Sequence, residues 1–416
     1  MNSLDRRRFL AGTGAVSLAS LLTGCRAFGI SGNGGGAEEG ETAGDGARDV
    51  TLGFIALTDF AALAIAEING YFEERDLNVL VRKETSWATT RDNLQSGEID
   101  GAHCLYSMPF SVASGIGGNG ARDMRIAMML NHNGQAINLT HEHFPDVGYG
   151  DIDAAGEALR GMSNPTLAMT FPGGTHDLWL QYWLMAMDID PMNDVNLQVT
   201  PPPEMVANAE RGEMVAYCVG EPWPGVTVSR DIGRTHLATQ DLWTHHPEKA
   251  LVVNTQFAEE REDVLRDVMG AILQASEWLD NPDNRAEAAE LISPQEWVNA
   301  PVEDIESRML GEYDLGDGTT EQYEDTQMLY FNDGFVNFPR KSHGIWALSQ
   351  YVRSGQLGAD EVDYDMVDEI VMQDLYREVA EAEGIDVPDD DMEPFEVALD
   401  GATFDPNNPE EEANRS

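Results

Sequence analysis

The order of its apolar segments constrains the fold of this chain more than any other feature. Three short runs rich in β-branched and apolar residues are DVTLGFIAL (49–57), LNVLVRKE (77–84) and IDGAHCL (99–105), and segments with helical spacing separate them. Strands that alternate with helices form a parallel sheet, because each helix carries the chain back to the same end of the sheet. The pattern therefore predicts an α/β unit, in which Thr58 and Asp59 cap the first helix.

The same alternation recurs between residues 124 and 254. MRIAMMLN (124–131) and GQAINLT (134–140) are expected to be adjacent strands joined by a turn at Asn133-Gly134, and further strands and helices follow. The stretch from 255 to 281 has the spacing of one long amphipathic helix, with Thr255 or Asn254 as its cap. Two consecutive α/β blocks predict two lobes. In such folds ligands bind beyond the carboxyl ends of the strands or between lobes.

The N-terminus has features of an export signal. A twin-arginine pattern at Arg6-Arg7-Arg8 precedes an uncharged segment that is too short to span a membrane as a stable helix, and Leu22-Thr23-Gly24-Cys25 resembles a lipobox. We expect residues 1–24 to be a Tat signal peptide, Cys25 to receive a lipid and residues 25–49 to form a flexible tether. The predicted location is the extracellular face of the cell membrane, with a lipid anchor.

The chain is strongly acidic. It contains 74 acidic and 25 basic residues, a formal net charge of −49 and only three lysines. Nucleic acid is excluded as an expected partner, because no basic stripe could neutralise phosphates. The composition suits concentrated salt: at about 1 M the Debye length is about 3 Å, so surface carboxylates barely repel each other. A halophilic origin is our interpretation, and an ordinary acidic protein is the alternative.

Four predicted strand ends carry side chains that donate hydrogen bonds. Trp87 follows the second strand, Gln135 lies in a tight glycine turn, His176 opens a helix after FPGGT, and Lys249 precedes an apolar run. Structural alternatives for the first three are a core tryptophan, a surface glutamine and an ordinary helix-start histidine. Lys249 is harder to explain as a surface residue, because the rest of the chain has almost no lysine.

Secondary candidates lie beside these four. Gly174 allows close backbone approach, and Thr175 can cap the helix that His176 opens, whose N-terminus favours anions. Glu221, in VGEPW, is a further candidate. Cys104 and Cys218 are predicted to be buried free thiols. No metal-ligand spacing and no nucleophile motif occurs in the sequence, so we expect no metal site and no enzyme.

The longest motifs are LGFIALTDFAALAIAEINGYF, SWATTRDNLQSGEIDGAHCL, VTPPPEMVANAERGEMVAYCVGEPWP and ATQDLWTHHPEKAL. Together they resemble the solute-binding proteins of ABC importers for nitrate and nitrite, and related bicarbonate-binding proteins share much of the pattern. The resemblance implies an α/β, two-lobed periplasmic-binding-protein-like fold of type II that clamps an anion in the inter-lobe cleft. It implies lobe 1 at 50–145 plus 256–383 and lobe 2 at 146–255, and residues 384–416 are predicted to form an acidic C-terminal strap.

The resemblance also implies that Trp87, Gln135, His176 and Lys249 hold the anion, that an ABC permease and ATPase are the partners, and that no cofactor is needed. Nitrate only accepts hydrogen bonds, so its site needs donors and no facing carboxylate. Bicarbonate-binding relatives use calcium and place an acidic residue where Lys249 stands, so Lys249 favours nitrate or nitrite.

Three other functions stay open at this stage. Glu221 and Glu248 leave bicarbonate possible, although Glu248 is expected to point away from the ligand or to pair with Lys249. Alkanesulfonate binding is compatible with the same fold, because a fold does not fix its ligand. An extracellular enzyme with His176 as its base is the most distant alternative.

Overall fold

The computed structural model describes residues 44 and 46–415, which fall within one compact unit. The predictions for the twin-arginine signal, for Cys25 and for nearly all of the tether lie outside the described residues. In the described part of the chain, no helix has the length and apolarity needed to cross a membrane.

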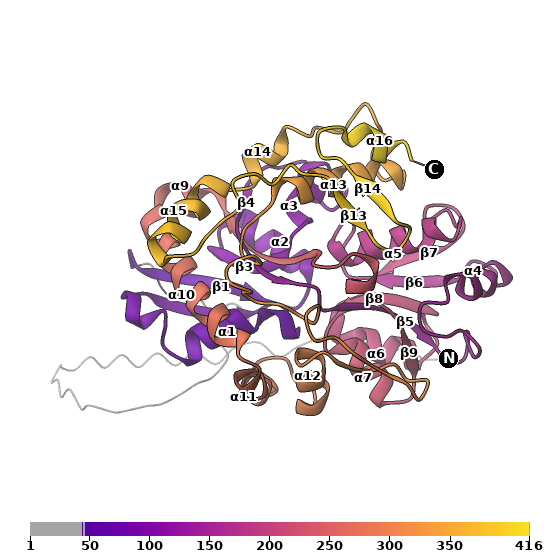
Figure 1. The fold of residues 1–416 in the computed structure, drawn as a ribbon. Coiled ribbons are helices and arrows are strands. Elements are labelled where there is room, and N and C mark those ends of the chain that lie inside the picture. The colour runs from indigo at the N-terminus through magenta and orange to yellow at the C-terminus, as the bar shows by residue number, and fades with distance from the viewer. Residues whose placement is uncertain (1–43, 45, 416) are drawn as a thin grey trace, which may run out of the picture. The chain divides into compact units, whose positions relative to one another are not determined.

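The first sheet combines the opening strands with one that returns from much later in the chain (Figure 1). Its spatial order is β2 (Asn78–Lys83), β1 (Asp49–Phe54), β3 (Gly101–Leu105), β10 (Pro247–Asn254) and β4 (Met124–His132). β2, β1 and β3 are parallel, as predicted, whereas β10 lies antiparallel between β3 and β4.

The second sheet repeats this plan. Its spatial order is β7 (Asn196–Val199), β6 (Thr166–Met169), β8 (Ala216–Gly220), β5 (Gln135–Thr140) and β9 (Gly233–Ala238). β7, β6 and β8 are parallel, and β5 is antiparallel to both β8 and β9. Each sheet thus has a fourth strand inserted in the opposite direction.

The chain passes between the two sheets earlier than the sequence suggested. β4 and β5 are not a hairpin: β4 ends the first sheet and β5 enters the second, so the crossing lies at Asn133-Gly134 and not near residue 145. The return crossing lies between β9 and β10, near residues 239–246, and not at 255. The apolar pattern alone could not place these crossings, because the partner strands are distant in sequence.

Helices cover the strands of both sheets. Those that precede β4 are η1 (Thr58–Phe60), α1 (Ala61–Ile68), η2 (Glu73–Arg75), α2 (Trp87–Ser96) and α3 (Met108–Ala113); those between β5 and β10 are α4 (Ile152–Gly161), α5 (Thr175–Ala186), α6 (Pro202–Glu210), α7 (Trp223–Ser229) and α8 (Thr239–Leu242). Those that follow β10 are α9 (Thr255–Glu260), α10 (Glu262–Asp280), α11 (Pro282–Ile292), α12 (Val302–Met309), α13 (Lys341–Arg353), α14 (Met366–Ile370) and α15 (Gln373–Glu383).

Two local expectations need correction. The stretch from 255 to 281 is two helices, because the backbone of Arg261 leaves the helical region between α9 and α10, although Asn254 caps the first of them as expected. Thr58 and Asp59 do not cap the following helix; both lie inside the 3-10 turn η1, and the Asp59 carboxylate turns toward the interior instead.

The described part of the C-terminal segment is ordered into small elements. β13 (Phe395–Val397) pairs with β14 (Ala402–Phe404), and α16 (Pro409–Ala413) packs on α13 (Figure 1). Asp400 and Arg415 both hydrogen-bond the hydroxyl group of Tyr182 in α5. The segment therefore contacts helices from both halves of the fold. A further hairpin, β11 (Glu312–Asp314) with β12 (Thr320–Gln322), precedes α13.

Candidate ligand-binding site

The four predicted donor residues meet at the place where the two sheets face each other. Trp87 opens α2 after β2, Gln135 begins β5, His176 lies in the first turn of α5 after β6, and Lys249 lies on β10. All four are buried, with at most 1% of each residue exposed. Two segments from each sheet therefore build one enclosed polar site.

Lys249 is the charged centre of this site. Lys249 pairs with Leu105 of β3 in the sheet, and its side chain is buried. There Nζ donates a hydrogen bond to Asp59 Oδ2 at 2.8 Å and another to Glu248 Oε1. Burial lowers the pKa of Lys249, and the Asp59 carboxylate opposes that shift. An ammonium group removed from water is stable only with such partners, so the carboxylates keep it charged.

Asp59 accepts a second hydrogen bond from the first sheet. His103 Nε2, on β3, lies 2.6 Å from Asp59 Oδ1, and both side chains are fully buried. Burial alone would raise the pKa of Asp59, but the Lys249 ammonium and the His103 ring hold it at about 2. Burial lowers the pKa of His103 despite the carboxylate. Asp59 is thus a permanent anion beside Lys249.

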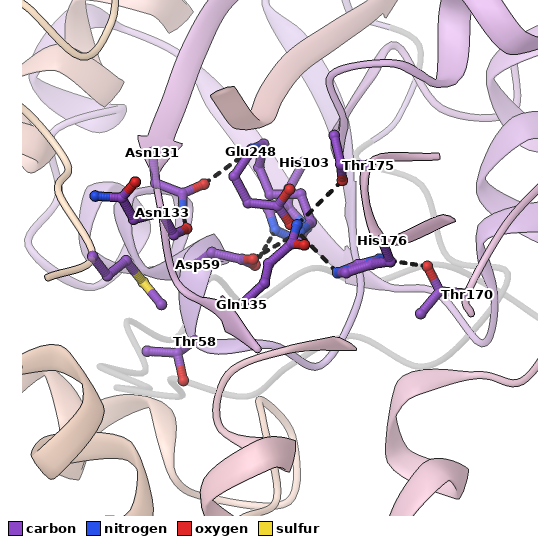
Figure 2. Close-up of polar contacts among 12 residues, drawn as sticks. Thr58, Asp59, His103, Asn131, Asn133, Gln135, Thr170, Thr175, His176 and Glu248 are labelled. Atoms are coloured by element: carbon purple, nitrogen blue, oxygen red, sulfur yellow. Dashed lines mark hydrogen bonds and ion pairs between the residues drawn. The ribbon is translucent and has the colours of Figure 1, made fainter. Parts of the chain in front are cut away.

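His176 is held by a hydroxyl group on the second sheet side. Thr170 Oγ1 lies 2.6 Å from Nδ1, and Nε2 faces Glu248 Oε1 at 3.5 Å (Figure 2). Burial, with the nearby Lys249 charge, moves the pKa of His176 well below its ordinary value, so the ring is neutral. When the Thr170 hydroxyl donates to Nδ1, Nε2 carries the proton and acts as a donor toward the centre of the site.

Gln135 and the first residues of α5 complete the part of the site that the second sheet contributes. Gln135 Nε2 donates to Thr175 Oγ1 at 3.2 Å, so Thr175 orients the amide and does not cap the helix as expected. Gly174 is the N-cap residue, and a Cβ atom there would lie 2.7 Å from a side-chain carbon of Leu105. Glycine at this position therefore lets the two halves approach closely.

Several buried polar atoms around the site have no hydrogen-bond partner among the described residues. They are Trp87 Nε1, His176 Nε2, Thr58 Oγ1 and Glu248 Oε2. Lys249 Nζ also lies 5.6 Å from the centre of the Trp87 ring, within the range of a cation–π contact. Buried polar groups are normally paired, so unpaired donors around one ammonium group mark a place for a polar ligand.

Glu221 lies beside this site but outside its centre. Its backbone nitrogen donates to Gly134 O, and its carboxylate lies 3.8 Å from the Arg308 guanidinium. Burial, only partly offset by Arg308, raises the pKa of Glu221 to about 7. The sequence did not indicate that Asp59 and His103 belong to this site. Glu248 was expected to pair with Lys249 or to point away from the ligand, and it pairs with Lys249.

The two sheets make direct contacts around the site. Tyr351 donates from its hydroxyl group to Gly173 O at 2.5 Å and to Ser107 O at 3.1 Å, and Ser111 Oγ donates to Pro172 O at 2.6 Å. Surface hollows of about 600 and 640 Å³ are lined by residues from both halves but by none of the four donors. The four donors are thus closed off from both hollows.

Two cysteines lie within residues 44 and 46–415. Cys104 and Cys218 are free and buried, as predicted, and burial raises the pKa of both thiols. Among the described side chains, no group of three or more His, Cys, Asp or Glu residues is placed to hold a metal ion.

Comparison with known proteins agrees with this architecture. Residues 43–293, more than half of the chain, match the model of the NMT1-like family. The chain belongs to the NMT1-like family. Three relatives are NrtA proteins. The nitrate/nitrite binding protein NrtA of Synechococcus elongatus is 38% identical and covers 99% of this chain and 97% of its own.

A solved structure supports the same relationship. The crystal structure of the periplasmic nitrate-binding protein NrtA from Synechocystis PCC 6803 matches with a TM-score of 0.81 at 38% identity, over 88% of this chain and 97% of that one. The bicarbonate-binding protein CmpA of Synechococcus elongatus is 28% identical over 98% of this chain and 96% of its own. The NMT1-like chain thus has the expected periplasmic-binding-protein fold, and the relatives described above are named as binding proteins for nitrate, nitrite or bicarbonate.

Proposed function

We propose that this protein captures nitrate or nitrite outside the cytoplasm for an ABC importer. One observation carries the proposal: Lys249 and three further donor side chains, Trp87, Gln135 and His176, are buried together between two sheets. The NrtA relatives, which are named for nitrate and nitrite binding, support the choice of ligand. The protein would hold its ligand without covalent chemistry and present the closed form to a permease and its ATPase.

Nitrate fits the donors that line the site. It is planar and singly charged, and its three oxygen atoms only accept hydrogen bonds. The Lys249 ammonium would neutralise the charge, while the Trp87 indole N–H and the His176 Nε2–H would each bind an oxygen atom. These bonds are stronger in a site closed to water than at a surface. Chloride would be discriminated by geometry, because its single atom cannot meet donors placed for three oxygen atoms.

Bicarbonate is the second candidate, and a specific observation favours it. Asp59 and Glu248 place carboxylate oxygen atoms beside Lys249, and bicarbonate carries a hydroxyl group that needs such an acceptor. The lysine itself still favours an anion without a proton. An alkanesulfonate would also need space for its organic group beside these donors.

The cellular setting is a further part of the proposal. The twin-arginine pattern and the lipobox-like Cys25 support export in a folded state and a lipid anchor on the outer face of the membrane. The net charge of −49 supports a halophilic origin, since concentrated salt screens such a surface.

Calorimetric titration of the purified protein in high chloride would test the ligand. Nitrate, nitrite, an alkanesulfonate, and bicarbonate with and without calcium are titrated separately. We expect saturable one-to-one binding of nitrate or nitrite. Calcium-dependent bicarbonate binding without nitrate binding would overturn the ligand assignment.

A further inference from the structure

Glu248 occupies a position that the proposed ligand would need. Its Oε1 atom accepts a hydrogen bond from Lys249 Nζ and lies 3.5 Å from His176 Nε2. Both are among the donors that we assign to the anion. Figure 2 shows Glu248 in the same cluster as His103, Gln135 and His176. Its other oxygen atom, Oε2, has no partner among the described residues.

A carboxylate and nitrate are chemically similar acceptors. Both are planar, carry a delocalised negative charge and bind the same cationic and N–H donors. Because Glu248 is fully buried, its charge cannot be screened by water at this place. An incoming anion would therefore meet a resident anion that already pairs with Lys249 and faces His176 Nε2.

The charges around the site add to the repulsion between an incoming anion and the Glu248 carboxylate. With both carboxylates ionised, Asp59 and Glu248 outweigh the single charge of Lys249, so the empty site carries a formal charge of −1, and a bound monovalent anion would bring it to −2. The remaining titratable groups near Glu248 do not offset this: burial keeps the histidines neutral and raises the pKa of the thiols and of Glu221. They are His103 and Cys104 on β3, His176 on α5, Cys218 on β8, Glu221 after β8 and His246 before β10.

We propose that Glu248 is a built-in competitor of the anion and that it takes up one proton from solution when the anion binds. The proton removes the charge of the carboxylate, frees Lys249 and His176 for the ligand, and turns Glu248 into a possible O–H donor to it. The resident carboxylate also gives Lys249 a partner in the empty protein. This inference rests on the proposed function, because it assumes a monovalent anion that only accepts hydrogen bonds.

Proton uptake can be measured on the unmodified protein. Nitrate is titrated at constant chloride in buffers with different enthalpies of ionisation, between about pH 5 and 8. The apparent enthalpy should vary with the buffer by an amount that corresponds to uptake of up to one proton. Because binding takes up a proton, the Kd for nitrate should increase by up to about tenfold for each unit by which the pH is raised. A Kd that is independent of pH, without buffer dependence, would overturn the inference.

The variant Glu248→Gln tests whether Glu248 is the group that takes up the proton. Glutamine keeps the shape of the side chain, removes the competing charge and cannot titrate, so nitrate should bind more tightly at high pH and with no pH dependence. The matched control is Glu412→Gln, which removes another buried carboxylate, bonded to Arg353 and Arg415, far from the site. The control should keep the wild-type pH dependence.

The other outcomes separate the two hypotheses. Weaker nitrate binding by Glu248→Gln would show that Glu248 supports the ligand, and an unchanged pH dependence would place the proton elsewhere; either result overturns the inference. If neither the wild-type protein nor the variant binds nitrate or nitrite at any pH, the proposed function itself fails.

Discussion

Asp59 Oδ2 lies 2.8 Å from Lys249 Nζ, and neither side chain is exposed to solvent. The pair joins the turn after the first strand to a strand that the chain reaches only after crossing to the second sheet and back. An ammonium group in this position has no water to solvate it. Its stability in the empty protein therefore depends on Asp59 and Glu248.

Replacement of Asp59 by asparagine should destabilise the fold. The change leaves Lys249 with one carboxylate fewer in a buried place, which costs about 3–5 kcal/mol in comparable buried pairs. Urea unfolding of the variant and the unmodified protein in the same buffer measures this loss of unfolding free energy. The matched control is Asp368→Asn, which removes an exposed partner 2.7 Å from Lys341 and should cost at most about 1 kcal/mol. Equal losses in both variants would contradict the buried role of Asp59.

Replacement of Lys249 by glutamine should abolish nitrate binding or weaken it greatly. Removal of one member of a buried charge contact costs about 2–5 kcal/mol, which is roughly 30-fold or more in Kd. Calorimetry measures the affinity, and circular dichroism checks that the fold remains. Lys341→Gln, which changes a partly exposed lysine paired with Asp368, should bind as the wild-type protein does. Unchanged affinity in Lys249→Gln would remove this residue from the site.

Replacement of Trp87 by phenylalanine tests the unpaired indole N–H. The variant keeps an aromatic ring beside Lys249 but cannot donate, so nitrate affinity should fall by about 1.5–3 kcal/mol, or roughly tenfold or more. Trp346→Phe is a suitable control, because that indole is also buried with an unpaired N–H but lies in α13. If both variants bind equally well, Trp87 is a core residue only.

Replacement of Tyr351 by phenylalanine should weaken closure of the site. Its hydroxyl group joins Gly173, after the second sheet's β6, to Ser107, after β3. Loss of one neutral hydrogen bond of about 1 kcal/mol would raise the nitrate Kd roughly fivefold without contact to the ligand. Tyr376→Phe serves as the comparison, since the Tyr376 hydroxyl is buried with no partner among the described residues. An effect of the same size there would argue against a role in closure.

Glu221 should make the fold less stable as the pH rises toward neutrality. Burial raises its pKa from 4.5 to about 7 in the folded state, so the folded protein holds the proton more tightly than the unfolded chain. The stability that this provides is complete below about pH 4.5 and is lost as the pH rises to about 7. Unfolding free energies measured across this range should fall less steeply in Glu221→Gln than in the unmodified protein.

The sequence predicted much of this site from strand ends alone. Trp87, Gln135, His176 and Lys249 were recognised as donors because each follows or begins an apolar run, and the structure buries all four in one place. Asp59 was missed, since a threonine and an aspartate before a helix look like a cap, and only the fold brings Lys249 within reach of that carboxylate.

The local sequence pattern also could not show which of the two sheets each strand joins. Hydrophobic periodicity identifies a strand but does not reveal its neighbours. β5 and β10 pair with strands that lie far away in sequence, which is why the crossings were placed too late. The register of Lys249 opposite Leu105 decides that its side chain meets Asp59, and that register is set by the whole sheet.

The position of the last described residues has a practical consequence. Arg415 bonds to Asp400, Glu412 and the Tyr182 hydroxyl, so the carboxyl end of the chain is fastened across helices from both halves. A purification tag or fluorescent fusion placed there would add bulk beside these contacts and could disturb the motion that it is meant to report. The turn at Gly318, which is exposed and has open space around it, is a better attachment point for a reporter.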